Sequence, residues 1–217
     1  MLKAEGLKKS YGTLQVLKGI DLQVNKGEIV AIVGASGAGK STLLHLLGTL
    51  DKPDSGQLLM NNENVFVKNA ADLARFRNNA IGFVFQFHNL LPEFSALENV
   101  MMPGFIGGKA EPDLKKRANE LLKILGLSQR AEHKPSEMSG GEQQRTAVAR
   151  ALINAPSIIL ADEPSGNLDS KTALELHQLF FKLRKELDQT FIIVTHNAEL
   201  AGMADRKIEL ADGLVKL

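Results

Sequence analysis

A glycine-rich segment near the start of the chain has the composition of a phosphate-binding loop. It reads Gly34-Ala35-Ser36-Gly37-Ala38-Gly39-Lys40-Ser41, with Thr42 next in the chain. Glycines let backbone N–H groups come close to an anion, and a helix that starts here adds the positive end of its dipole. Lys40 can reach the β- and γ-phosphates of a nucleoside triphosphate, and the Ser41 hydroxyl can bind Mg²⁺. The apolar run Glu28–Val33 before the glycines and the helical run after them argue against a chance glycine-rich turn.

Two acidic residues follow a second apolar run, Ser157–Ala161. Asp162, at the end of a strand beside a phosphate-binding loop, can hold Mg²⁺ directly or through water. Glu163 can orient and polarise an attacking water molecule as a general base. The alternative is that these acids only mark the transition from a strand to a loop. The presence of Gly34–Ser41 in the same chain argues against it. Together these segments favour the magnesium-dependent hydrolysis of a nucleoside triphosphate.

Two more polar residues come directly after apolar runs. His196 follows Phe191–Thr195, and Gln86 follows Ile81–Phe85. A lone histidine at such a place is usually structural, and either residue alone is weak evidence. Polar residues at strand ends are, however, where ligands bind in open α/β sheets. We therefore expect His196 near the γ-phosphate, and Gln86 in contact with magnesium or water.

A second helix start has features of an anion site. Ser139 and Glu142 have the spacing of a capping box, and Gly140 and Gly141 leave backbone N–H groups accessible to an anion. The alternative is ordinary capping of the helical run Thr146–Ile153. A second phosphate-binding element is redundant within one chain, so the segment needs a further explanation.

The elements that must position these residues indicate an α/β fold with a mostly parallel sheet. Short apolar runs alternate with longer helical patterns, such as Leu114–Leu125 and Ala173–Leu187. The stretch up to Val24 and the region 58–67 predict an N-terminal antiparallel β layer. Between Glu93 and Pro135 the pattern is helical, with Pro103 and Gly107-Gly108 as expected interruptions.

We predict one domain over residues 1–217. Residues 1–92 and 157–217 would form the nucleotide-binding α/β core. Residues 93–156 would form an inserted helical subdomain that carries the segment around Ser139.

Composition limits the partners and the compartment. The 26 basic and 25 acidic residues give a net charge of +1 and no electrostatic footprint for nucleic acid. The chain has no cysteine, which excludes disulfides and thiolate metal sites. Its start, Met1–Glu5, lacks the apolar core of a signal peptide, and no run reaches the ~20 apolar residues of a membrane span. We expect a cytoplasmic chain that does not insert into the membrane and meets it only through a partner.

The segment Met138-Ser139-Gly140-Gly141-Glu142 resembles the signature motif of ABC ATPases, and it lies one short helix upstream of Asp162-Glu163, as in that family. Methionine replaces the usual leading leucine, and Glu142 stands where glutamine is more usual, which puts in doubt any hydrogen bond that needs an amide there. The resemblance covers nearly the whole chain and implies further roles: Tyr11 stacking on adenine, Gln86 in the glutamine loop, Ser165–Asp169 as the D-loop and His196 as the switch histidine.

Membership of that family would imply a P-loop NTPase core and an ATP hydrolase that works as a head-to-tail homodimer. Two ATP molecules would be sandwiched in the pair. Each would be bound by the phosphate loop of one subunit and by Ser139, Gly140, Gly141 and Glu142 of the other.

Within the family, Phe85–Pro103, Leu47–Asp51 and Arg130–Glu137 resemble the ATPase subunits of lipoprotein-releasing (Lol) complexes. That resemblance implies integral membrane permease subunits as partners and a place at the cytoplasmic face of the inner membrane. The implied work is the release of lipoproteins from that membrane. The alternatives are a MacB-like export ATPase, an FtsE-like ATPase that controls a membrane partner mechanically without moving cargo, and a soluble metabolic or repair ATPase.

Overall fold

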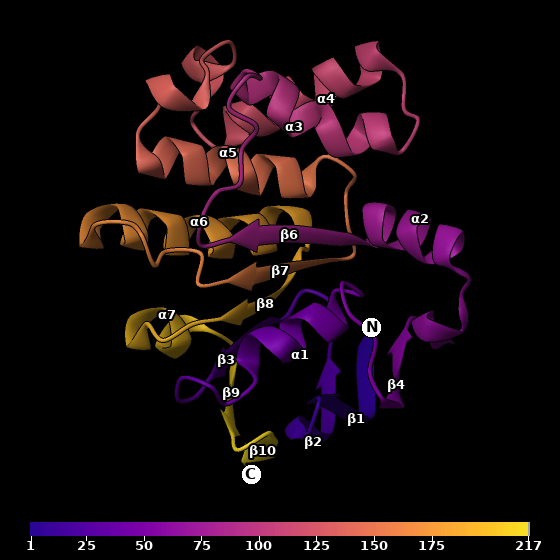
Figure 1. The fold of residues 1–217 in the computed structure, drawn as a ribbon. Helices are drawn as coiled ribbons and strands as arrows, with labels where there is room; N and C mark the ends of the chain where they lie inside the picture. Colours follow the sequence, from indigo (N-terminus) through magenta and orange to yellow (C-terminus); the bar gives the residue numbers. More distant parts are fainter. Residues whose placement is uncertain (217) are drawn as a thin grey trace.

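The computed structural model describes residues 1–216 and contains a six-stranded, mostly parallel sheet (Figure 1). The strand order is β10-β9-β3-β8-β7-β6, and only β10 pairs antiparallel, with β9. The strands are β3 (Ile29–Val33), β6 (Ile81–Phe85), β7 (Ile158–Asp162), β8 (Thr190–Val194), β9 (Arg206–Ala211) and β10 (Leu214–Lys216). The predicted α/β class and the three apolar runs read as strands are confirmed, with ends that shift by one residue.

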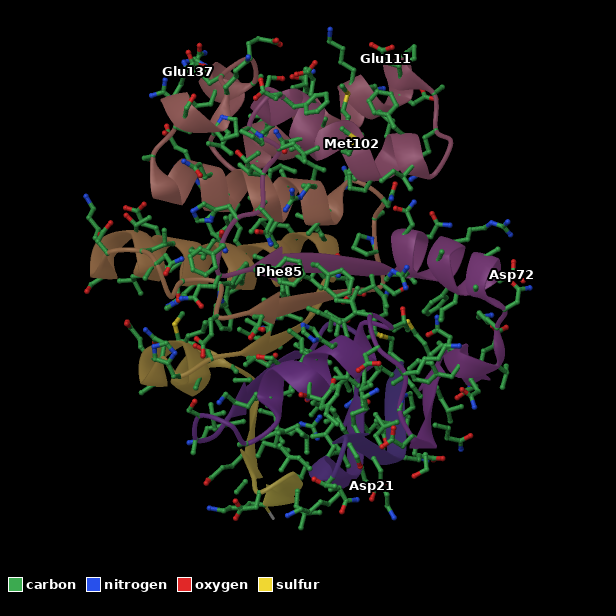
Figure 2. All side chains as sticks on the ribbon, in the orientation of Figure 1. Asp21, Asp72, Phe85, Met102, Glu111 and Glu137 are labelled. Atoms are coloured by element: carbon green, nitrogen blue, oxygen red, sulfur yellow. The ribbon has the colours of Figure 1, made fainter. Side chains whose placement is uncertain are left out.

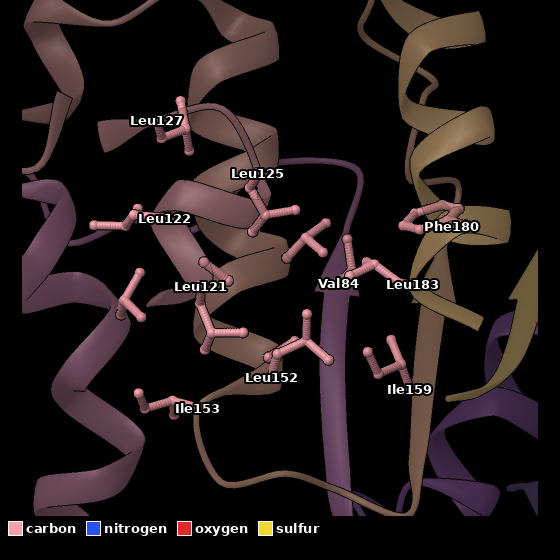
Figure 3. Close-up of a cluster of buried hydrophobic side chains, with 14 of the residues drawn as sticks. Val84, Leu121, Leu122, Leu125, Leu127, Leu152, Ile153, Ile159, Phe180 and Leu183 are labelled. Carbon is pink, nitrogen blue, oxygen red and sulfur yellow. The ribbon is translucent and has the colours of Figure 1, made fainter. Parts of the chain in front are cut away.

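The central strands are continuous apolar runs because both of their faces are covered. Side chains alternate between two buried clusters along each strand. In β8, Phe191 and Ile193 belong to a cluster shared with the helices that follow in the sequence, whereas Ile192 and Val194 face α1 (Lys40–Leu47) and the second sheet. Figure 3 shows the first cluster, in which strand side chains such as Val84 and Ile159 lie on one side of the core with Phe180 and Leu183 of a neighbouring helix. The Phe180 ring itself lies 5.2 Å from the Phe191 ring.

The second sheet is antiparallel, in the order β2-β1-β4-β5, and confirms the predicted N-terminal β layer. Its strands are β1 (Leu2–Tyr11), β2 (Leu14–Val24), β4 (Ser55–Met60) and β5 (Glu63–Asn64). The last residues of the region 58–67 form a 3₁₀ turn, Val65–Val67. The turn starts here because the Asn64 side chain accepts a hydrogen bond from the Phe66 N–H.

Three helices lie between β6 and β7 in the sequence and cover the same side of the parallel sheet as α6 (Ser170–Leu187) (Figure 1). They are α3 (Ala96–Ile106), α4 (Glu111–Ile124) and α5 (Gly140–Leu152). The remaining helical segments are α2 (Ala70–Ala80), α7 (Ala198–Met203) and the 3₁₀ turns Ser128–Arg130 and Pro135–Glu137. In Figure 2, Phe85 of β6 lies between the helices α3, α4 and α5 on one side and the other strands of the sheet on the other side. The division at residues 93 and 156 stays a prediction.

Pro103 does not interrupt the helical pattern as expected. It lies inside α3, which continues to Ile106 and ends at Gly107. Proline removes one N–H and therefore one helical hydrogen bond. The missing N–H would otherwise donate to the carbonyl of Asn99, four residues earlier, and α3 continues without that bond. The Pro103 carbonyl itself accepts from the Gly107 N–H (3.1 Å) and from Asn154 Nδ2 (3.1 Å).

The start of α5 is held by the predicted capping box. Ser139 Oγ accepts from the Glu142 N–H (3.3 Å), and Glu142 Oε2 accepts from the Ser139 N–H (2.8 Å). Arg130 Nε donates to the other carboxylate oxygen of Glu142 (2.8 Å). The Ser139 N–H and the Arg130 guanidinium lower the pKa of Glu142 from its ordinary 4.5 to about 2. Because the side chain is only 18% exposed, this pairing is partly shielded from solvent.

We expect the substitution Glu142→Gln to destabilise the protein by roughly 2 kcal/mol at pH 7, because the amide cannot replace the charged partner of Arg130. A carboxyl group whose pKa is lower in the folded state stabilises the fold above its unfolded pKa. This contribution is lost as the pH falls from about 4.5 to about 2. Urea denaturation of both proteins at stepped pH measures the difference, with exposed Glu175→Gln as the control. A difference that stays constant from pH 7 to pH 3 would contradict the assignment.

Ala155, just after α5, carries a left-handed backbone at φ 52° and is exposed. Alanine is strained there and glycine is not, so Ala155→Gly should stabilise the protein by about 1 kcal/mol. Ala74→Gly, at an exposed position inside α2, should destabilise it by a similar amount, about 1 kcal/mol. Thermal denaturation of the two variants should give shifts of opposite sign; equal signs would refute the strain at Ala155.

Candidate functional site

The carboxyl ends of four neighbouring parallel strands meet along one edge of the sheet. The glycine-rich loop follows β3, His196 follows β8, Asp162 and Glu163 end β7, and Gln86 follows β6. Strand order brings the ends of β3, β8 and β7 side by side, although they lie far apart in the sequence. Ligands of open α/β sheets bind at such an edge.

The glycine-rich loop is shaped by close backbone contacts. At Gly34 (φ 150°) an added Cβ would lie 2.1 Å from the Leu210 carbonyl oxygen, and at Gly39 (φ 97°) 2.8 Å from Leu17 Cδ2. Gly39 also precedes α1 and offers no side chain to cap it. The first N–H groups of α1 therefore point out of the helix start without a capping side chain, which is the arrangement that binds phosphate.

Lys40 lies at the centre of this loop. Its Nζ donates to the carbonyl oxygens of Gly34 (2.9 Å) and Ala35 (2.8 Å), and the Ala38 N–H donates to Ala35 O (3.2 Å). A hollow of about 400 Å³ opens beside the ammonium group. Of the predicted site residues, nine line it: Tyr11, Ser36, Gly37, Gly39, Lys40, Ser41, Thr42, Asp162 and Glu163.

Asp162 and Ser41 offer an oxygen pair suited to Mg²⁺. Ser41 and Asp162 both line the hollow, and burial raises the pKa of the Asp162 carboxyl group above its ordinary range. Within residues 1–216 no three His, Cys, Asp or Glu side chains gather into a metal-binding group. Mg²⁺ binds through few protein oxygens and completes its shell with phosphate and water, so a serine hydroxyl and a carboxylate are suitable ligands for it.

Glu163 and His196 are held against each other at the mouth of the hollow. His196 Nδ1 lies 2.9 Å from Glu163 Oε1, and the His196 N–H donates to Glu163 Oε2 (3.2 Å). Glu163 has a left-handed backbone (φ 45°), and its N–H donates to Val194 O (2.9 Å). The Glu163 side chain is 19% exposed, against 73% for His196. A carboxylate fixed beside a hollow and still open to water can act as a base.

Tyr11 lies at the other side of the hollow with its ring half-exposed. Its hydroxyl donates to Asp51 Oδ2 (2.8 Å), and Lys9 Nζ donates to Asp51 Oδ1 (2.8 Å) and sits 5.1 Å from the ring centre. The hydrogen bond to Asp51 raises the pKa of Tyr11. The ring is thereby fixed in one orientation, with a face available for stacking.

Gln86 is not brought to the hollow. Its Nε2 donates to Asn167 Oδ1 (3.0 Å), and Asn167 Nδ2 donates back to Gln86 O (3.2 Å). The Gln86 side chain thus connects the end of β6 to the segment Ser165–Asp169. Its contact with magnesium or water stays a prediction.

The segment Ser139–Glu142 also lies outside the hollow of its own chain. A Cβ added to Gly141 would be 2.4 Å from Thr172 Cγ2, so this glycine permits close packing on the start of α6. Val16 and Val194 also line the hollow, although no sequence pattern marked them as part of the site. Asp51 and Asn167 belong to segments singled out in the sequence, but their contacts with Tyr11 and Gln86 were not predicted. These contacts join distant positions, and no local pattern marks them.

Known proteins resemble this chain in sequence and in fold. Residues 17–166 match the model of the ABC transporter family. The lipoprotein-releasing system ATP-binding protein LolD of Bacteroides thetaiotaomicron is 59% identical over 100% of this chain and 99% of its own length. The protein of the same description from Cytophaga hutchinsonii is 58% identical, over 99% and 98%. A dimeric ATP-binding cassette solved in a post-hydrolysis state with ADP and Pi has a TM-score of 0.90 and 42% identity, over 100% of this chain and 97% of its own. The chain therefore belongs to the ABC transporter family, within which its relatives include lipoprotein-releasing system ATP-binding proteins.

Proposed function

We propose that this chain binds and hydrolyses ATP as the motor subunit of a membrane ABC transporter that releases lipoproteins from the inner membrane. The observation that carries the hydrolytic part is the Glu163–His196 pair, held at the hollow that Lys40 lines. The family membership and the identity to lipoprotein-releasing system proteins support the rest.

In this proposal Lys40 and the loop N–H groups bind the β- and γ-phosphates, and Tyr11 stacks on the adenine. Ser41 and Asp162 would hold Mg²⁺, which neutralises phosphate charge when it is bound. Glu163 accepts a proton from the attacking water, and His196 holds the carboxylate in place through Nδ1 and its N–H. Gln86 would reach magnesium or water only after its bond to Asn167 opens.

The proposed working unit is a head-to-tail homodimer. Ser139, Gly140 and Gly141 lie away from the hollow of their own chain, and Ser139 and Gly140 are exposed, which supports their proposed binding to the γ-phosphate held by a second copy. Glu142 acts mainly through the capping box and Arg130, which removes the need for an amide at this position. The related cassette was solved as a dimer, which supports the same assembly here.

Integral membrane permease subunits are the proposed partners, at the cytoplasmic face of the inner membrane. Within residues 1–216 no helix combines the length and apolarity needed to cross a bilayer. An apolar hollow of about 430 Å³ opens between α2, α3, α5 and β6, lined by side chains such as Phe83, Phe85 and Ile106. It includes part of the segment Phe85–Pro103, whose sequence resembles the permease-docking region of relatives, and it fits an apolar helix of a permease.

Replacing Glu163 by glutamine should reduce ATP turnover about 10²- to 10⁴-fold, because the amide cannot accept the proton. ATP binding should be unchanged, since Lys40 and the loop remain, and the closed dimer should accumulate. Phosphate release, ATP affinity and the dimer fraction at saturating ATP are the measurements. The matched control is Glu175→Gln, exposed on α6. Undiminished turnover by the Glu163 variant would remove this residue as the base.

Purification from native membranes in mild detergent should recover the chain with multi-span permease subunits, identified by mass spectrometry. In liposomes with those subunits, an added lipoprotein substrate should raise ATP turnover. Turnover that ignores lipoprotein would favour mechanical control of a membrane partner, the FtsE-like alternative. Recovery only from the soluble fraction would contradict the membrane role and leave the ATPase proposal standing.

A further inference from the structure

A buried histidine on α6 has one hydrogen-bond partner. His177 is fully buried, and its Nε2 lies 2.9 Å from Ser165 Oγ, itself almost fully buried. Among the described residues, no partner lies within reach of His177 Nδ1. Buried polar atoms usually have hydrogen-bond partners, so a buried histidine with only one such partner needs an explanation.

Because Nδ1 has no partner, we can assign which atom of the His177–Ser165 bond donates the proton. Burial lowers the pKa of His177, against the opposing charge of Glu199, so the ring is neutral and has one N–H and one bare nitrogen. A buried N–H without an acceptor is rarer than a buried acceptor without a donor. The proton therefore sits on Nε2 and is donated to Ser165 Oγ.

Ser165 lies within the turn that follows the proposed base. The Gly166 N–H donates to Glu163 O (3.0 Å), and the Leu168 N–H donates to Ser165 O (3.1 Å). The next anchors along the segment are at the surface: Asn167 bonds to Gln86, and Asp169 caps α6. The His177–Ser165 bond is thus the interior anchor of a turn in which Glu163 has a left-handed backbone.

We propose that His177 is a positioning residue for Glu163: by donating Nε2–H to Ser165 Oγ, it fixes the turn Glu163–Gly166 and thereby the carboxylate beside His196. The catalytic part of this inference rests on the proposed role of Glu163. The positioning part does not, because it concerns a turn whose order can be measured without nucleotide.

Two amide substitutions separate the hydrogen bond from packing. The amide nitrogen of His177→Gln reaches about as far as Nε2, whereas that of His177→Asn ends near the position of Nδ1. Ser165→Ala removes the other partner with little change in volume. We expect kcat to fall about 10- to 100-fold in His177→Asn and Ser165→Ala, because small displacements of a reacting group have effects of this size. KM for ATP should change less than about twofold, and His177→Gln should retain kcat within about threefold.

The double variant His177→Asn/Ser165→Ala should lose no more activity than either single variant, because both changes break the same bond. Equal losses in the Asn and Gln variants, additive losses, or a KM that moves as much as kcat would overturn the proposal. If buried asparagine prevents folding, Ser165→Ala provides the second test: it breaks the same bond, leaves His177 Nε2–H without an acceptor and introduces no new polar group.

Amide hydrogen exchange of the full chain without nucleotide gives the second readout. Protection of the Gly166 and Leu168 N–H groups should fall in His177→Asn and Ser165→Ala and persist in His177→Gln. Unchanged protection in all variants would refute the positioning role even if activity changed. Absence of ATP turnover in the unsubstituted chain would count against the proposed function instead, and amide exchange would then decide the positioning role alone.

Discussion

Burial of the parallel strands on both faces is the constraint on which the rest of the structure depends. Side chains of β3, β7 and β8 fill two apolar clusters, so none of these faces can carry a charged group. Polar chemistry is therefore confined to the strand ends. The strand order then decides which ends meet: β8 lies between β3 and β7, and His196, two residues after β8, contacts Glu163 at the end of β7.

Because these strands are buried on both faces, their positions could be predicted from the sequence. Continuous apolar runs located three central strands to within one residue, and the Ser139–Glu142 spacing marked the start of α5. Weak patterns were missed: α2 buries only Leu73, and β9 carries exposed residues at alternate positions. The expected interruption at Pro103 was wrong, because the other contacts of α3 outweigh the one helical hydrogen bond that proline removes. Side-chain pairs such as Tyr11–Asp51 and Gln86–Asn167 follow from tertiary packing that no local pattern records.

The segment Met138–Glu142 both caps the start of α5 and is the part of the chain proposed to contact a second copy. The carboxylate of Glu142 binds the Ser139 N–H and Arg130 and so stabilises the helix start, at which Ser139 and Gly140 are exposed. Gly141 packs on α6, which starts at the segment Ser165–Asp169. The start of α5 therefore lies apart from the glycine-rich loop of its own chain. In the proposed homodimer, a second chain would bring the two helix starts to one ligand.

The backbone of Glu163 carries a consequence for how such a chain evolves. A non-glycine residue with φ 45° costs about 1–3 kcal/mol, which the surrounding hydrogen bonds must offset. Selection for heat resistance alone would favour replacing this residue by glycine, and the same replacement would discard the carboxylate. With Glu163 as the proposed base, directed evolution that screens only for stability would lose hydrolysis at this position. A strained glutamate here is the compromise expected where turnover, and not stability alone, is selected.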